Sequence, residues 1–175
     1  MSVISFTSVH ELSPAELCNY IEHEYYQEIK DLLHHIKTYT ESLAEQNDRN
    51  ERAAFLSLLF LKLEAETLQI MRNDEQVIFP IIRKNELKKT CGGTKMPVQM
   101  IQQMDLKILA LLEKMRHLLN NYLPENGCSE AFDDNNNNLF KLEQKLQQAI
   151  HIKENLLLYK VKDKFNQECS GNCNV

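Results

Sequence analysis

Three carboxylates stand at positions where helical periodicity calls for apolar side chains. Each comes four residues after an isoleucine of its stripe, at Asp74, Asp105 and Glu154. A buried carboxylate is costly unless it is paired or binds a metal. Helical bundles build metal sites from inward carboxylates on facing helices, and Tyr26 near the same inward band would add a phenolate oxygen. The pattern thus indicates an oxygen-ligand metal site or, if these positions lie at the stripe edges, solvated or ion-paired carboxylates.

The six histidines, which are the usual partners of carboxylates in such metal sites, do not fall on the apolar stripes. His151 and Glu154 form an H-x-x-E sequence, but His151 is the neighbour of Ile150 and should turn away from the core. His34 and His35 are adjacent in the sequence, so on a helix their side chains point about 100° apart. We therefore expect all six at the surface: His10, His23, His34, His35, His117 and His151.

Four amphipathic segments must position the carboxylates. Apolar residues recur at helical spacing over 13–43, 56–81, 97–122 and 139–165. Ser13-Pro14-Ala15-Glu16 is a capping box at the first helix start, and Pro80 should kink or end the second helix. The second stripe includes Val77, and the asparagine-rich stretch 124–138 reads as a loop. The sequence predicts an all-α, up-down-up-down four-helix bundle with four isoleucines in its core: Ile29, Ile70, Ile108 and Ile150.

Composition supports one helical domain. The 175 residues include only four Gly and four Pro, too few for the many turns of an all-β fold. We expect an N-terminal arm at 1–12, the bundle at 13–166, and a flexible tail at 167–175 that carries Cys169 and Cys173, a candidate redox pair. The net charge of −5 argues against nucleic-acid binding. No signal peptide or membrane-spanning run is evident, and five cysteines are an odd number, so we expect a cytoplasmic protein with reduced thiols.

Four segments resemble a known family. The stretch IMRNDEQVIFPII (70–82) resembles the second-helix signature of hemerythrin-like domains, closest to the repair-of-iron-centres family of iron-sulfur cluster repair di-iron proteins. The stretches YIEHEYYQEIKDL (20–32), LLEKMRHLLNNYLPENGC (111–128) and AIHIKENLLLYKV (149–161) resemble its other helices in the same order. The resemblance implies a non-haem di-iron centre, held by four inward histidines and two bridging carboxylates.

Carried over position by position, the resemblance implies that both bridging carboxylates remain, as Asp74 and Glu154. Every ligand histidine is replaced; the substitutes are Tyr26, Ile70, Asp105, Ile150 and, in the first interhelical loop, Asn47. Isoleucine cannot bind metal, and its apolar surface stabilises a metal-free core. The residual metal positions are Asp74, Glu154, Asp105 and Tyr26.

We therefore expect a metal-free or weakly metal-binding, stress-related binding or regulatory module, and no cofactor, rather than an enzyme. The alternative is a non-haem iron protein, or one with another weakly bound cation, whose oxygen ligands serve iron-sulfur repair or the response to nitric oxide and oxidative stress. A third hypothesis is thiol chemistry at Cys169 and Cys173. Expected partners are another protein or a second copy, as monomer or homodimer, with no nucleic acid and no membrane. Asp74 and Glu154 should face each other, neutralised by a proton, by Tyr26, by a bound cation, or by a side chain such as Arg72 or Lys107.

Overall fold

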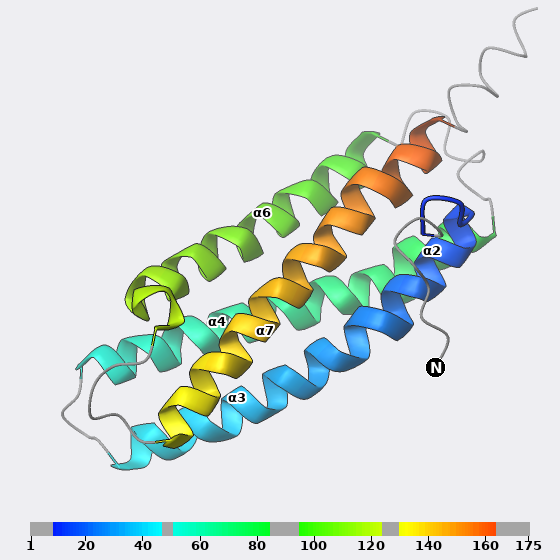
Figure 1. Ribbon diagram of the computed structural model, residues 1–175. Coiled ribbons are helices and arrows are strands. Elements are labelled where there is room, and N and C mark those ends of the chain that lie inside the picture. Colours follow the sequence, from blue (N-terminus) through cyan, green and yellow to red (C-terminus); the bar gives the residue numbers. More distant parts are fainter. Residues whose placement is uncertain (1–8, 47–50, 85–94, 124–129, 164–175) are drawn as a thin grey trace, which may run out of the picture.

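The computed structural model describes residues 9–46, 51–84, 95–123 and 130–163, and within these ranges it contains helices and no strand. Figure 1 shows long helical rods that lie side by side. The predicted all-α helical bundle is therefore confirmed. The expected tail at 167–175 and most of the N-terminal arm lie outside the described residues. None of the described helices is both long enough and apolar enough to cross a membrane.

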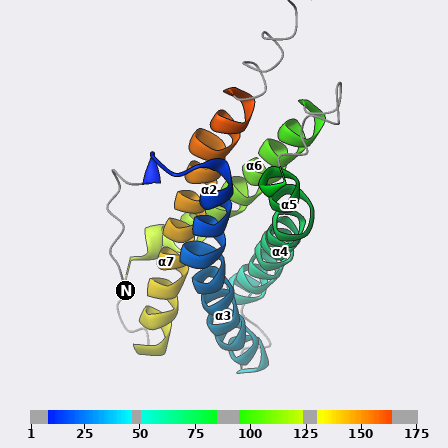
Figure 2. The same cartoon turned by 90° about the vertical axis from the view of Figure 1, so that its right-hand side faces the viewer.

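Each rod is built from consecutive helical elements. The first comprises α2 (Pro14–Ile21), η1 (Glu22–Tyr26) and α3 (Gln27–Gln46), and the second comprises α4 (Glu51–Asn73), η2 (Asp74–Ile78) and α5 (Phe79–Arg83). The third is α6 (Lys95–Leu118) followed by η4 (Asn120–Tyr122). The fourth comprises α7 (Glu130–Ile152), η5 (Lys153–Leu157) and a last helical stretch over 158–163. Helix α3 contacts α4 and α7, and α4 contacts α6; at the other end α2 contacts α5 and η5 (Figures 1 and 2).

The first helix begins where the sequence predicts. Ser13 Oγ accepts a hydrogen bond from the Glu16 N–H at 3.3 Å, and Glu16 Oε2 accepts one from the Ser13 N–H at 2.8 Å. This reciprocal box satisfies two N–H groups that the helix itself leaves without partners. Lys160 joins the fourth rod to this end of the chain, because its Nζ donates to the carbonyls of His10 and Leu12 at 2.6 Å each.

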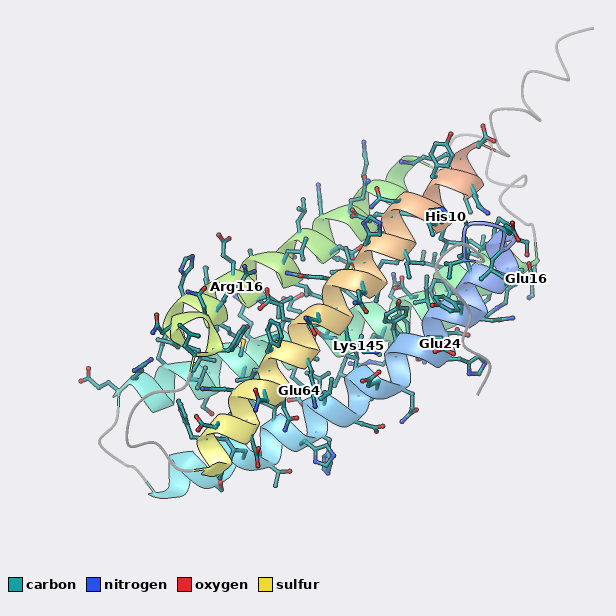
Figure 3. The ribbon with its side chains drawn as sticks, viewed as in Figure 1. His10, Glu16, Glu24, Glu64, Arg116 and Lys145 are labelled. Carbon is teal, nitrogen blue, oxygen red and sulfur yellow. The ribbon has the colours of Figure 1, made fainter. Side chains whose placement is uncertain are left out.

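Most of the buried side chains are apolar, and the four isoleucines expected in the core are all buried: Ile29, Ile70, Ile108 and Ile150. Several ion pairs lie around the periphery of the bundle. Lys145 of α7, labelled in Figure 3, pairs with Glu28 of α3 at 2.6 Å, and Lys37 of α3 pairs with Glu64 of α4 at 3.2 Å. Such partly exposed pairs contribute on the order of 0–1 kcal/mol each, so apolar burial dominates the stability of the bundle.

Two sequence expectations about local structure are wrong. The segment Asn135–Asn138 is helical rather than a loop, because α7 begins at Glu130, and Asn135 and Asn136 are buried. Asparagine is a poor helix former, but packing against the bundle overrides that small preference. Val77 is 47% exposed, and its neighbour Ile78 is buried in its place. The cause is the wide turn η2, which moves the inward face by one position.

Wide π-helical turns interrupt three of the four rods, at η1, η2 and η5. Such turns carry an extra residue per turn and occur mostly as short insertions, frequently at functional sites. Pro80 follows η2 within the same rod instead of ending it, since a proline near the start of α5 removes a backbone donor that the wide turn does not need.

Candidate functional site

A lysine lies in the middle of the bundle between two aspartates. Lys153 Nζ donates to Asp74 Oδ2 at 3.0 Å and to Asp105 Oδ1 at 2.8 Å. The side chain of Lys153 is 3% exposed, and those of the two aspartates are 1% exposed. All three groups are therefore withdrawn from water and depend on one another for their electrostatic stabilisation.

Tyr26 completes the cluster from the first rod. Its hydroxyl donates to Asp74 Oδ2 at 2.6 Å, so this oxygen accepts hydrogen bonds from both the phenol and the ammonium. The ring stacks on Phe79, with centroids 6.1 Å apart and planes inclined by 16°. The stacking fixes the direction in which the phenol reaches the carboxylate.

Each of the four rods contributes one member of this core cluster, which we define as Tyr26, Asp74, Asp105 and Lys153. Tyr26 is the last residue of η1, Asp74 the first of η2 and Lys153 the first of η5, whereas Asp105 lies within α6. Three members thus sit at an edge of a π-helical turn. The wide turns aim these side chains inward at a common depth, which connects the irregular backbone directly to the geometry of the cluster.

Burial and neighbouring charges shift the pKa values of Asp105 and Lys153 in opposite directions. Burial raises the pKa of Asp105 to about 6, although the nearby charge of Lys153 opposes that rise. Burial alone would lower the pKa of Lys153, but the charges of Asp74 and Asp105 outweigh it and raise the pKa. Burial, followed by the charge of Asp74, holds the pKa of Tyr26 well above its ordinary value. Tyr26 is therefore a neutral donor and Lys153 a cation at neutral pH.

The cluster formally carries one positive and two negative charges. One oxygen of each carboxylate, Asp74 Oδ1 and Asp105 Oδ2, is buried without a hydrogen-bond partner among the described residues. A cavity of about 20 Å³ adjoins Tyr26, Asp105 and Lys153, and its remaining lining is mostly apolar. Burial is the main reason why Asp105 takes up a proton more readily than an exposed aspartate does, and the charge of Asp74 adds to it.

Of the four residual metal positions, the structure brings three together and leaves out Glu154. That residue is half-buried whereas Asp74 is fully buried, so the two carboxylates do not lie at the similar depth that the sequence predicts. Positions 153 and 154 lie three and four residues after Ile150, and both spacings share a helix face, so periodicity could not choose between them. The structure places Lys153 inward.

Sequence reasoning also did not identify Lys153 as the buried cation. Arg72 and Lys107, suggested as neutralising side chains, are both exposed. The available signal was that Lys153 lies three residues after Ile150 and four before Leu157, both of which are buried. A lysine at the edge of a stripe usually extends its ammonium to water, which is why this signal was not decisive.

The donor set of the core cluster does not fit an iron pair. Ile70 and Ile150 line the cavity at two positions where the resemblance implies histidine ligands. The carboxylates are already bonded to an ammonium, and a metal ion there would lie against its positive charge. The six histidines are exposed, as predicted, and the described residues hold no group of three His, Cys, Asp or Glu able to bind a metal.

The thiols offer no second site in the described ranges. Cys169, Cys173 and Asn47 lie outside these ranges. Cys18 is fully buried in the core, where burial raises the pKa of its thiol to about 12. A thiol with so high a pKa is a poor nucleophile at neutral pH, and Cys18 therefore acts as a packing residue.

Comparison with known proteins does not assign the chain to a family. No protein-family model matches it, and no curated protein sequence matches it.

Proposed function

We propose that this protein is a hemerythrin-like bundle that works without a metal, with the ammonium of Lys153 supplying the positive charge that its buried carboxylates require. In this proposal the protein is a binding or regulatory module in the stress response, in the manner of the iron-centre repair family, and it interacts with a protein partner. The observation that carries the metal-free part is the pair of short contacts from Lys153 Nζ to Asp74 and Asp105.

Charge and burial support this reading. A cation bound at the two aspartates would have to displace Lys153, whose side chain is 3% exposed. Moving an ammonium out of such a position leaves either an unpaired buried charge or a rearranged helix, and breaking a buried pair typically costs about 3–5 kcal/mol. An iron site with oxygen ligands would therefore have to overcome the loss of the internal ion pair before it gained any coordination energy.

The fold supports the family part of the proposal. The family pattern requires four helices in an up-down-up-down order, and the course of the colours along the rods in Figure 1 is in keeping with that order. The positions that correspond to the family's ligands, Tyr26, Ile70, Asp74, Asp105 and Ile150, are all buried. Their common burial supports a former ligand site whose chemistry has been replaced by an ion pair.

Metal analysis tests the proposal. We expect protein purified from iron-replete cells to contain only substoichiometric iron, and its thermal unfolding to be unaffected by chelator. Lys153→Met provides the matched comparison, because it removes the ammonium and retains a chain of similar length. Added Mg²⁺ or Mn²⁺ should raise the melting temperature of this variant, whose carboxylates have lost their cation, and not that of the parent. Stoichiometric iron in the parent, lost together with stability on chelation, would overturn the proposal.

A further inference from the structure

Three polar residues of the core lack a full set of hydrogen bonds, and all three belong to the lining of the same cavity. Thr67 Oγ1 and Asp105 Oδ2 are buried and have no hydrogen-bond partner in the described part of the chain. The ammonium of Lys153 has three N–H donors, and the hydrogen bonds found in the described ranges use two of them. Thr67, Asp105 and Lys153 all contribute to the cavity wall.

The size of the cavity limits what it can hold. Its volume is about 20 Å³. A single water needs roughly 10–15 Å³ measured in this way, together with two to four polar partners. The volume is therefore sufficient for one water. Most of the remaining wall is hydrocarbon, from side chains such as Ile70, Ile108 and Leu146, and Tyr26, whose hydroxyl already donates to Asp74, also lines it.

We propose that this cavity is a binding site for one internal water molecule, held by Thr67, Asp105 and Lys153. The water accepts a hydrogen bond from the third N–H of Lys153 and donates to Asp105 Oδ2. Its second hydrogen is directed to Thr67 Oγ1. One molecule thereby satisfies all three groups, which matches the usual count of about three hydrogen bonds for a buried water.

The water adds a connection that the protein atoms lack. Thr67 lies on α4, Asp105 on α6 and Lys153 on η5, so the water joins three of the four rods at the level of the ion pair. It also completes the solvation of the ammonium, which otherwise gives two of its three donors to carboxylates. This inference concerns the hydration of the core and is independent of whether the protein belongs to the proposed family.

A crystal structure of the parent protein provides the direct test. We expect electron density for one water within hydrogen-bond distance of Thr67 Oγ1, Asp105 Oδ2 and Lys153 Nζ. In solution, protein labelled at isoleucine methyl groups should show water-to-methyl Overhauser transfer at Ile70 and Ile108, which line the cavity. A cavity without density and without transfer to these methyl groups would overturn the proposal.

Thr67→Val gives a second test, because the sign of its effect on stability depends on whether the cavity holds a water or is dry. Valine keeps the shape of threonine and removes the hydroxyl. If the water is bound, the variant loses a hydrogen bond and weakens the site, so its unfolding equilibrium constant should rise about tenfold. If the cavity is dry, the variant only removes an unpartnered buried hydroxyl, and the constant should stay equal or fall.

Thr40→Val is the matched control for this comparison. Thr40 is also buried, but its hydroxyl donates to backbone carbonyls of Ile36 and Lys37 at 3.0 and 2.9 Å. Its loss shows what removal of a satisfied threonine hydroxyl costs in this bundle. An effect of Thr67→Val similar to that of Thr40→Val supports the water, and a stabilising effect of Thr67→Val overturns it. If Thr67→Val does not fold, the parent measurements decide.

Discussion

Lys153→Met should be among the most damaging single substitutions in the protein. Methionine has nearly the length of lysine and fills the same space, so the change removes the ammonium with little loss of packing. Two carboxylates with side chains 1% exposed then lose a partner at 2.8 and 3.0 Å. Removing one partner of a buried ionic cluster costs about 3–5 kcal/mol. The total stability of a domain is about 5–15 kcal/mol, so the loss is a large share of it.

Urea unfolding followed by circular dichroism measures this loss. The control is Lys107→Met, which makes the same exchange at an exposed position two residues from Asp105 and should change stability by less than about 0.5 kcal/mol. The cost of Lys153→Met should shrink in acid, because the stranded carboxylates then take up protons and need no cation. Adding Asp105→Asn to Lys153→Met should recover part of the loss. Equal stability of the two methionine variants at neutral pH would refute the reasoning.

Three further predictions follow from the core cluster. The pKa of Asp105 is raised to about 6, so the favourable contribution of this residue to stability is complete below about pH 4 and is lost as the pH rises through 6, a change of about 3 kcal/mol. Asp105→Asn should remove this loss, so in urea titrations the stability of the variant relative to the parent should increase from about pH 4 to pH 7. Parallel pH profiles of the two proteins would contradict the assignment. Tyr26→Phe should lower the free energy of unfolding by about 1.5–3 kcal/mol because Asp74 loses a charged hydrogen bond, and a double-mutant cycle with Asp74→Asn should give a clear coupling energy, whereas simple additivity would count against the contact. Glu154→Gln, by contrast, should change the melting temperature very little, since Glu154 is only half-buried and outside the cluster, and a loss comparable to that of Lys153→Met would show that Glu154 is the inward residue.

Much of the fold could be predicted because apolar periodicity and burial express the same physics. Ile29, Ile70, Ile108 and Ile150 recur at helical spacing, and all four are buried. The capping box at Ser13 and Glu16 uses only local chemistry, which the sequence states directly. The start of α7 could not be predicted in this way, since the asparagines that precede Leu139 have a weak helix preference and their state depends on packing against other rods.

The candidate site could be predicted only in part. Burial of Asp74, Asp105 and Tyr26 follows from their spacing, and it is confirmed. The choice of Lys153 over Glu154, and of Ile78 over Val77, depends on wide turns that change the residues per turn locally. No pattern in a single sequence predicts a π-helical turn, because the turn depends on the packing of the whole bundle. The single shift of one position exchanges a carboxylate for a cation and thereby changes the predicted chemistry of the site.

The most direct test of the central claim is a crystal structure of protein purified from iron-replete cells, with diffraction data collected at the iron absorption edge. The account predicts that Lys153 Nζ lies within hydrogen-bond distance of Asp74 and Asp105, and that no anomalous peak is present between the two carboxylates. An anomalous peak bonded to Asp74 or Asp105, with Lys153 turned away from them, would contradict the account.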